Sequence, residues 1–420
     1  MVERNWAGNI AYSATRFHEP STVAEVQSIV AESAKVRAVG SRHSFNTIAD
    51  TTGDQVSLAS LQRVVEIDSD AHSVTIDGGI RYAELAVELH SHGWGLANLA
   101  SLPHISVAGA CATATHGSGA RNGNLASAVQ AMQLVTAEGD LVDVSRADEP
   151  ELMDAATVGL GAFGIVTRLT LAIEPTFSVS QRVYQNLPMP TAVSRLEEIM
   201  GDGYSVSLFT SWRDDFVEQL WRKQRSATDG DEDDGVSSPR YGAMPATSDV
   251  HPIAEQSGES CTEQMGVPGP WHERLPHFRM GFTPSSGDEL QSELFVAAAD
   301  GAEVLRTLVS LRDVLAPVLK ISEVRAVAAD RMWLSPCYMR DCIAFHFTWV
   351  QSWADVEPVL ARMESALATF SPRPHWGKLS TISGRVLRSR FEQLDAFEEL
   401  IVGGDPNGKF RNAYIDKLLS

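Results

Sequence analysis

The chain has 420 residues, 44% of them hydrophobic and 21% charged, and its formal net charge is −20 at pH 7. This composition is that of a globular protein, and the length favours two domains over one. The negative charge argues against nucleic acid and anionic membranes as partners, and no apolar run approaches the ~20 residues that span a bilayer.

The opening sequence MVERNWAGNI has no basic start followed by an apolar stretch, so we expect no secretory signal and a cytoplasmic protein. The four cysteines form no CxxC pair and have no histidine cluster beside them; they are Cys111, Cys261, Cys337 and Cys342. We therefore expect no metal site and four free thiols.

The first 175 residues mix helical and strand-like patterns. The predicted elements are a helix over 20–35, a strand over 36–40, a strand over 73–79, a helix over 81–93, a hairpin over 132–144 and a strand over 163–175. Thr22 and Glu25 form a capping box at the first helix, Gly93 ends the second helix, and Glu138-Gly139 is the hairpin turn. This order favours a mixed α+β domain over a repeating βαβ wind.

The middle of the chain has a different character. Residues 226–242 are acidic and glycine-rich, which predicts a solvated loop, and the prolines of residues 266–278 predict an ordered loop. Helices are expected near residues 301–319 and 352–370, and they flank two strands that carry polar residues.

Two segments of the first domain suit a phosphate-bearing ligand. In AVGSRHSFN, residues 38–46, a turn at Gly40-Ser41 leaves backbone N–H groups pointing outward, and Arg42 could add charge. SLPHISVAGACATATHGSG, residues 101–119, is rich in glycine, serine and threonine, so its backbone could approach a ligand closely. Neither segment has GxGxxG spacing or a Walker lysine, and a tightly packed segment without a ligand remains the alternative.

Two predicted strands alternate polar and apolar residues. Glu323 and Arg325 are two residues apart in KISEVRAVA, and His346 and Thr348 are two apart in CIAFHFTWV, so each pair shares a sheet face. The opposite face of the second strand carries Phe345, Phe347 and Trp349. The polar faces could build a cavity wall, or they could simply face solvent as in an ordinary antiparallel sheet.

Several motifs occur in a fixed order: GSRHS, SVAGACATATHGSG, GAFGIVTRLTL and, near the end, DPNGKFRNAY. Together with NWAGN and TEQMGVPGPWHERLPHF, they resemble the vanillyl-alcohol oxidase family of FAD-dependent oxidases, and within it the alditol oxidases. The resemblance implies a two-domain α+β flavoprotein. Residues 1–175 would form the FAD-binding domain, completed by about 400–420, and residues 176–399 a substrate-binding cap domain on an antiparallel sheet.

The resemblance also implies a covalent cofactor, since the histidine matching His43 is joined through its ring to the flavin 8α-methyl carbon. Many relatives have glycine at the position of Arg42, which is tolerable here if its φ stays negative. His104 stands where doubly linked relatives carry a cysteine, so a single linkage is expected. The expected FAD-binding residues are Val39, Gly40, Ser41, Arg42, His43, Ser44, Ser101, Ser106, Gly109, Thr113, Ala114, Thr115, His116, Val166 and His375.

In the alditol oxidases, the polyol is surrounded by positions that match residues present in this chain. The expected substrate-binding residues are Ser101, Glu323, Arg325, His346, Thr348 and Lys378. Arg325 and Lys378 would polarise the reacting hydroxyl. Glu323 would fix Arg325 and is a candidate to relay the proton, and the resemblance leaves open which group acts as the base. Ala100 matches a position where a small side chain leaves oxygen a route to the flavin.

The expected function is FAD-dependent oxidation of the terminal alcohol of an alditol, such as xylitol or sorbitol, to the aldose. Hydride would pass to flavin N5, and O2 would be reduced to H2O2. The alternatives are an aldonolactone oxidase or dehydrogenase of the same family, and a polyol-binding protein that has lost its flavin. The expected partners are a polyol and O2, with no nucleic acid and no membrane, and the expected state is a monomer.

Overall fold

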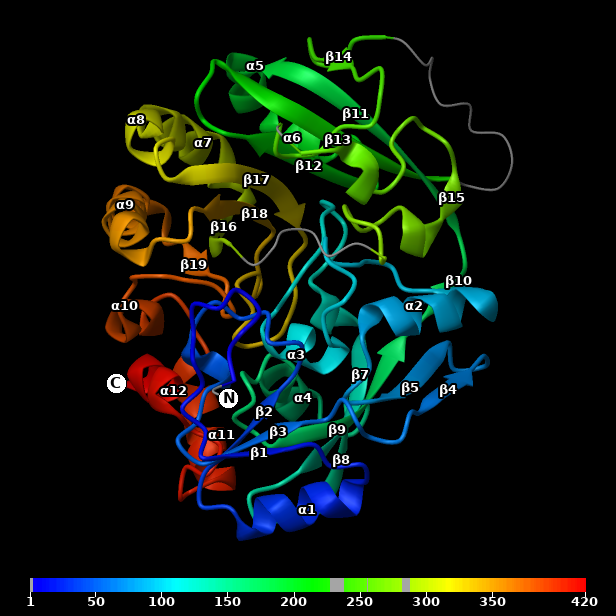
Figure 1. Ribbon diagram of the computed structural model, residues 1–420, viewed down its shortest axis with the longest axis vertical. Coiled ribbons are helices and arrows are strands. Elements are labelled where there is room, and N and C mark those ends of the chain that lie inside the picture. The colour runs from blue at the N-terminus through cyan, green and yellow to red at the C-terminus, as the bar shows by residue number, and fades with distance from the viewer. Residues whose placement is uncertain (1–2, 227–237, 255, 282–287) are drawn as a thin grey trace.

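The computed structural model describes residues 3–226, 238–254, 256–281 and 288–420. Most of the predicted acidic loop, residues 227–237, lies outside the described residues. A broad sheet with helices on one side forms the upper part of the molecule in Figure 1, and two smaller sheets form the lower part, where both chain ends lie. The helices in the described part of the chain are all too short or too polar to cross a membrane.

The lower part contains two sheets. A parallel sheet has the order β1-β3-β2, formed by Arg16–His18, Asp54–Ser57 and Val36–Val39. An antiparallel sheet has the order β4-β5-β9-β7-β8, formed by Val65–Asp68, Ser73–Asp77, Ile165–Ala172, Val129–Val135 and Leu141–Ser145. The helices are α1 (Val23–Glu32), α2 (Tyr82–Ser91), α3 (Val107–Ala112) and α4 (Pro150–Ala156), and the short strands β6 (Trp94–Gly95) and β10 (Glu174–Pro175) pair with each other. Helix and strand are therefore mixed as predicted.

Local sequence signals set several of these boundaries. The Thr22 hydroxyl accepts from the backbone N–H of Glu25 at 3.2 Å, and the Glu25 carboxylate reaches back to the N–H of Ser21 at 2.7 Å. Gly93 lies beyond the end of α2 with φ +81°, and Gly139 turns the β7–β8 hairpin with φ +90°. Both glycines adopt the left-handed backbone that other residues avoid.

The upper part is a nine-stranded, antiparallel sheet. Its order is β14-β11-β13-β12-β17-β18-β16-β19, with β15 also on β11. These strands are Met244–Pro245, Ser178–Pro188, Phe216–Ser226, Ser205–Thr210, Leu319–Val327, Cys342–Trp349, Leu290–Ala297 and Arg373–Pro374, and β15 is Gly269–Pro270. Helices α5 (Met189–Ser194), α6 (Leu196–Met200), α7 (Gly301–Ser310), α8 (Arg312–Leu315) and α9 (Trp353–Ala366) cover one face (Figure 1).

The core under these helices confirms the predicted alternation, because Phe345, Phe347 and Trp349 all point into it. The helix predicted over 301–319 is shorter than expected. The chain breaks at Leu311 between α7 and α8 and is already in strand β17 at Leu319. Pro317, which cannot donate a helical hydrogen bond, precedes that strand. The 266–278 segment is ordered, as predicted, with one short strand and one helical turn.

The last helices return to the lower part of the molecule. They are α10 (Gly384–Arg388), α11 (Leu394–Gly404) and α12 (Ala413–Leu419). Phe397 and Ile415 join the hydrophobic core of the N-terminal sheets. We therefore propose that the return to the first domain begins before residue 400.

Arg37 on β2 links this C-terminal part to the N-terminal sheets. Its buried guanidinium donates to the carbonyl oxygens of Leu160, Gly161 and Phe410 at 2.7, 3.1 and 2.8 Å, and also to that of Ile48. Burial lowers the pKa of Arg37 to about 10. These carbonyls therefore bind the Nη1 and Nη2 groups of a cation that has to stay inside the fold.

Candidate active site

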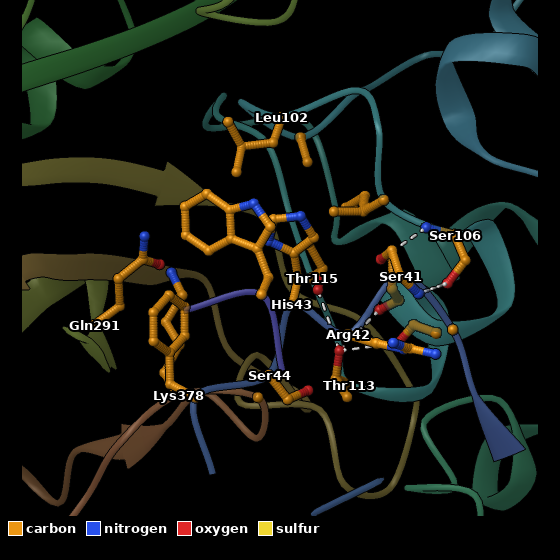
Figure 2. Close-up of a pocket in the computed structure, with 18 of the residues that line it drawn as sticks. Ser41, Arg42, His43, Ser44, Leu102, Ser106, Thr113, Thr115, Gln291 and Lys378 are labelled. Atoms are coloured by element: carbon orange, nitrogen blue, oxygen red, sulfur yellow. Dashed lines mark hydrogen bonds between the residues drawn. The ribbon is translucent and has the colours of Figure 1, made fainter. Parts of the chain in front are cut away.

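A cavity of about 330 Å³ lies where the face of the nine-stranded sheet opposite its helices meets the N-terminal part of the chain. The turn after β2 and the segments around α3 line one side, and strands β16, β17 and β18 line the other. Figure 2 shows Lys378 and Gln291 on one side of His43, and Ser41 and Ser106 on the other. The two groups of residues singled out by the sequence therefore meet in one cavity.

The two segments that the sequence singles out as suited to a phosphate-bearing ligand, residues 38–46 and 101–119, form hydrogen bonds with each other at this cavity. The Ser41 N–H donates to the Ser106 hydroxyl at 3.3 Å, and the Ser106 N–H donates to the Ser41 hydroxyl at 3.2 Å. A Cβ on Gly40 would lie only 2.1 Å from Ser106 Oγ, and one on Gly109 only 2.7 Å from it. Gly40 therefore leaves the room for the close approach of the two segments, and Gly109 leaves room for the Ser106 side chain within its own segment.

Arg42 departs from what the sequence predicts. Its φ is +62°, a left-handed backbone, so the condition under which arginine is tolerable here, a negative φ, is not met. The Arg42 carbonyl accepts from the N–H of Trp6 at 2.8 Å, and its guanidinium pairs with Glu3 and lies over the ring of Phe17. These contacts with the N-terminal segment hold the unfavourable conformation, and they occupy the charge that was expected to meet a pyrophosphate.

His43 lies between two aromatic rings. The Trp6 ring centroid is 4.7 Å from that of His43, and the His104 centroid is 4.6 Å away on another side. The Nε2 atoms of the two histidines are 2.7 Å apart, so one of them donates to the other. Burial, helped by the nearby charges of His104 and Arg81, lowers the pKa of His43 to about 3. The ring is therefore neutral and keeps a free electron pair near pH 7.

The cavity fits an extended ligand with phosphates and a planar ring. Seven glycines in its wall leave backbone exposed to the ligand: Gly40, Gly78, Gly79, Gly109, Gly161, Gly164 and Gly377. His116 is buried in the same wall, and its Nε2 lies 3.2 Å from Glu293 Oε1. The predicted FAD-binding residues that line the cavity are Val39, Gly40, Ser41, Arg42, His43, Ser44, Ser101, Ser106, Gly109, Thr113, Thr115, His116, Val166 and His375. Ala114 is not among them, since its side chain packs into the N-terminal core.

The polar faces of β17 and β18 line the cavity and do not face solvent. Glu323, Arg325, His346 and Thr348 are only 5–7% exposed. Glu293 on β16, His346 on β18 and Glu323 on β17 stand opposite one another in the strand register. The sheet thus presents a row of ionisable side chains to the ligand space.

Arg325 is held chiefly by Glu293, a residue that the sequence analysis missed. Arg325 Nη2 donates to Glu293 Oε1 at 2.8 Å and Nη1 to the Ser101 hydroxyl at 3.4 Å. The predicted partner, Glu323, is farther away, with its Oε1 3.6 Å from Arg325 Nε. Lys378 Nζ donates to Glu293 Oε2 at 2.6 Å, so one carboxylate joins both cations. The available signal was that Glu289, Gln291 and Glu293 recur at every second position, with Leu290, Ser292 and Leu294 at the positions between and after them.

The charges of this cluster stabilise one another. Burial alone would raise the pKa of Glu293, but Lys378, His116 and Arg325 outweigh it and hold that pKa well below its usual range. Burial lowers the pKa of Lys378 despite the attraction of Glu293. Burial and the Lys378 charge lower the pKa of His346 to about 3. Near neutral pH the cluster therefore combines an ionised Glu293 with a neutral imidazole.

Glu323 is bound by His277, the second residue that the sequence analysis missed. His277 Nε2 lies 2.8 Å from Glu323 Oε1. Burial opposes ionisation of Glu323, but Arg325 and His277 lower its pKa strongly. His277 lies at the end of the proline-rich 266–278 segment, where the pattern of the sequence predicted only an ordered loop. That loop therefore contributes directly to the cavity.

Two further contacts complete the wall. His346 Nδ1 lies 2.9 Å from Lys378 Nζ, and its Nε2 lies 3.1 Å from the Thr348 hydroxyl. A lysine ammonium only donates, so Nδ1 accepts and Nε2 carries the ring proton toward Thr348. Ala100 and Ser101 also line the cavity. All six predicted substrate-binding residues therefore lie around one space.

Comparisons with known proteins agree with this architecture. Residues 14–145 match the FAD binding domain family, and residues 290–418 match the D-arabinono-1,4-lactone oxidase family. The alditol oxidase of Streptomyces sp. (strain IKD472 / FERM P-14339) is 47% identical over 99% of this chain and 98% of its own length. The L-gulono-1,4-lactone dehydrogenase of Mycobacterium tuberculosis is 29% identical over 99% of this chain and 98% of its own. A crystal structure of cholesterol oxidase from B. sterolicum has the same fold, with a TM-score of 0.79 at 15% identity, covering 100% of this chain and 96% of its own.

Proposed function

This chain belongs to the vanillyl-alcohol oxidase family of FAD-dependent oxidases, and we propose that it oxidises the terminal primary alcohol of an alditol to the aldose. The observation that carries the proposal is the convergence of Arg325 and Lys378 on Glu293 in a cavity wall that also offers Thr348 and Ser101. A ligand rich in hydroxyl groups needs such a set of paired donors and acceptors. The full-length similarity to the Streptomyces alditol oxidase supports the same substrate class.

FAD is the cofactor that the cavity would hold. The turn over 40–44 and the segment around Ser106 would bind its phosphates, and Val166 and His375 would contact its rings. When bound, FAD supplies the acceptor for the hydride of the alcohol and returns the electrons to O2, which gives H2O2. We further propose a covalent bond to His43, because its ring is neutral, half-buried and positioned in the cavity wall.

The protein groups would bind and polarise the reacting alcohol. Arg325 and Lys378 would bind the hydroxyl oxygen and stabilise its developing negative charge. Arg325 stays protonated, because Glu323 and Glu293 raise its pKa despite burial, so it supplies charge and does not carry the proton. Among the described residues no donor binds Glu323 Oε2, which leaves that oxygen to accept a hydrogen bond from a substrate hydroxyl.

The remaining polar side chains would set the register of the polyol. Thr348 and Ser101 would bind hydroxyl groups farther along the chain, and His346 would donate to Thr348. Holding the carbon chain in one register keeps the terminal carbon at the reacting position, and this orientation raises the rate of the chemical step.

The activity test compares H2O2 production from xylitol, sorbitol and L-gulono-1,4-lactone. We expect the two alditols to give the higher kcat/KM values. An aldonolactone oxidase or dehydrogenase is the second candidate, because the D-arabinono-1,4-lactone oxidase match covers the strands of the polar wall. Turnover of the lactone alone would establish that candidate. Protein purified without a yellow colour would instead point to a polyol-binding protein.

The linkage test is acid precipitation of the purified protein. We expect the yellow colour to stay in the washed pellet of the wild type and to leave it in His43→Ala. The exposed His92 gives the control, since His92→Ala should keep the coloured pellet. Colour that washes out of the wild-type pellet would leave the flavin in place and exclude the bond to His43.

We also propose a cytoplasmic monomer. The four cysteines are all free and buried, as expected in a reducing compartment, and one chain lines the whole cavity described above. Light scattering after size exclusion tests the monomer, and cell fractionation tests the location.

A further inference from the structure

A chain of three polar side chains leads from the cavity into the interior behind Glu323. His277 Nε2 lies 2.8 Å from Glu323 Oε1, and Lys223 Nζ lies 3.3 Å from the other ring nitrogen, His277 Nδ1. All three side chains are buried, and Lys223 is only 1% exposed. An ammonium in the interior is costly unless its protons are bound, so the surroundings of Lys223 determine what it can do.

The three residues come from three separate segments. Lys223 on β13 and Glu323 on β17 point to the same face of the sheet, since both strands pair with β12 and the register places the two residues on one side. His277 bridges them from the 266–278 segment. Its ring packs edge-on against Trp221 and Phe209, with centroids 5.2 and 5.4 Å away, which limits its rotation.

The protons of Lys223 assign the tautomer of His277. Lys223 Nζ also lies 2.5 Å from the carbonyl oxygen of Leu275 and 3.1 Å from that of Pro276. Its three N–H bonds thus face three acceptors, and one of these is His277 Nδ1. Because Nδ1 accepts, the ring proton lies on Nε2 and is donated to Glu323. A carboxylate bound in this way is favoured in its ionised form.

We propose that Lys223 and His277 are positioning residues, which hold Glu323 ionised and oriented toward the substrate hydroxyl by fixing one tautomer of the His277 ring. This inference rests on the proposed alcohol oxidation. Lys223 acts through His277, and His277 acts through Glu323. The proline-rich loop and the long strand β13 thereby take part in the reaction although neither carries a group expected to polarise the alcohol.

The other titratable groups that face this chain are Arg325 and His346 beside Glu323, and Arg325 and Cys261 beside Lys223. Burial lowers the pKa of Lys223 to about 7 and that of His277 to about 4. Below the pKa of Lys223 and above that of His277, the pair is therefore an ammonium and a neutral imidazole. In this state the Lys223 ammonium donates to the carbonyl oxygens of Leu275 and Pro276 and to His277 Nδ1, so the ring proton of His277 lies on Nε2.

The kinetic test uses two amides at one position. In His277→Gln the side-chain N–H takes the place of Nε2 and still donates to Glu323, whereas in His277→Asn it falls near the place of Nδ1 and does not reach. We expect kcat with xylitol to stay within about tenfold of wild type in His277→Gln and to fall at least ~100-fold in His277→Asn, at equal flavin content. Equal losses of kcat in the two variants overturn the proposal. If the histidine had only a structural role, the N–H of glutamine near Glu323 would restore no activity.

Lys223→Met tests the role of the lysine, since it keeps the apolar stem and removes the donor. The ring proton can then move to Nδ1, toward the vacated carbonyls, and the Nε2 electron pair repels Glu323. We expect the acid limb of the kcat/KM profile to move up by about one pH unit or more. Lys417→Met, at an exposed lysine, is the control and should leave the limb in place. An unmoved limb in Lys223→Met overturns the proposal.

A measurement without substrate separates this inference from the proposed function. Nitrogen-15 NMR of histidine-labelled holoenzyme reports the tautomer of each ring, and the His277 signals are those lost in His277→Gln. Below the pKa of Lys223 we expect the neutral tautomer with its proton on Nε2. An imidazolium, or a proton on Nδ1, overturns the inference. If the wild type fails to oxidise alditols, the proposed function fails while this signal still decides the tautomer.

Discussion

Arg325 and Lys378 are joined by one fully buried carboxylate, that of Glu293, which accepts from Arg325 at 2.8 Å and from Lys378 at 2.6 Å through its two oxygens. The two cations that would bind the reacting hydroxyl are therefore fixed relative to each other before any substrate arrives. Their mutual repulsion is offset inside the protein by a group that lies opposite His346 in the sheet.

Glu293→Gln should damage stability and activity together. The amide keeps the shape of the side chain but leaves the buried Arg325 and the half-buried Lys378 without their counter-charge, and breaking a buried ion pair costs about 3–5 kcal/mol. We expect the free energy of unfolding to fall by about this amount and kcat to fall at least ~100-fold. Urea unfolding and steady-state kinetics with xylitol measure the two effects.

The control is Glu364→Gln, at a buried carboxyl that the hydroxyls of Ser380 and Thr381 bind. Burial raises the pKa of Glu364, so the neutral amide is a close substitute there. We expect a loss below about 1.5 kcal/mol and unchanged kcat. If both variants lose the same stability, then the charge of Glu293 is not what holds the two cations.

Position 42 should tolerate only residues that adopt a left-handed backbone conformation. Asparagine adopts φ near +60° at little cost, whereas a β-branched residue does so at about 1–3 kcal/mol. We therefore expect Arg42→Val to unfold at least ~1 kcal/mol more easily than Arg42→Asn in urea. Both variants lose the contacts with Glu3 and Phe17, so the difference between their free energies of unfolding measures the cost of the backbone conformation alone. Equal stability would mean that the turn relaxes to a negative φ.

Thr348→Val should weaken binding more than turnover. The substitution keeps the shape of the side chain and removes a hydroxyl that lies 3.1 Å from His346 Nε2 and faces the substrate space. One lost hydrogen bond is worth about 0.5–1.5 kcal/mol, so KM for xylitol should rise up to about tenfold with kcat changed less. Thr170→Val, on strand β9 of the N-terminal sheet, should change neither. A fall in kcat alone would place the hydroxyl in the chemical step.

The buried neutral histidines should make the protein sensitive to acid. His346 has a folded pKa of about 3 against an ordinary value of 6.5, so between these values the unfolded chain binds one more proton than the folded one. The contribution of His346 to the free energy of unfolding is fully present above pH 6.5. It is lost as the pH falls below that value, with a slope that approaches about 1.4 kcal/mol per pH unit.

Urea unfolding at several pH values measures this slope. His346→Gln should make the loss of stability on acidification shallower, and His92→Gln, at an exposed histidine, should leave the slope as in wild type. An unchanged slope in His346→Gln would show that this ring takes up a proton in the folded protein.

Much of the site could be predicted because it depends on local spacing. The two cavity-lining segments were found from their small residues, and the shared faces of Glu323 with Arg325 and of His346 with Thr348 follow from the period of a strand. These features need only neighbours in the sequence.

The missed features depend on contacts between distant segments. Glu293 meets Arg325 through the register of strand β16 against β18, and no local pattern fixes that register. His277 reaches Glu323 from a loop whose path the sequence leaves open. The positive φ of Arg42 depends on the N-terminal segment, which one turn cannot reveal.

The buried guanidinium of Arg37 has a consequence for biosynthesis. It donates to Phe410, and side chains of α11 and α12 pack into the core of the N-terminal sheets, so the cofactor domain needs segments that are synthesised after the nine-stranded sheet. The N-terminal sheets are synthesised long before these partners exist. Loading of FAD therefore has to follow the synthesis of α11 and α12, and a nascent chain interrupted after the nine-stranded sheet should carry no flavin.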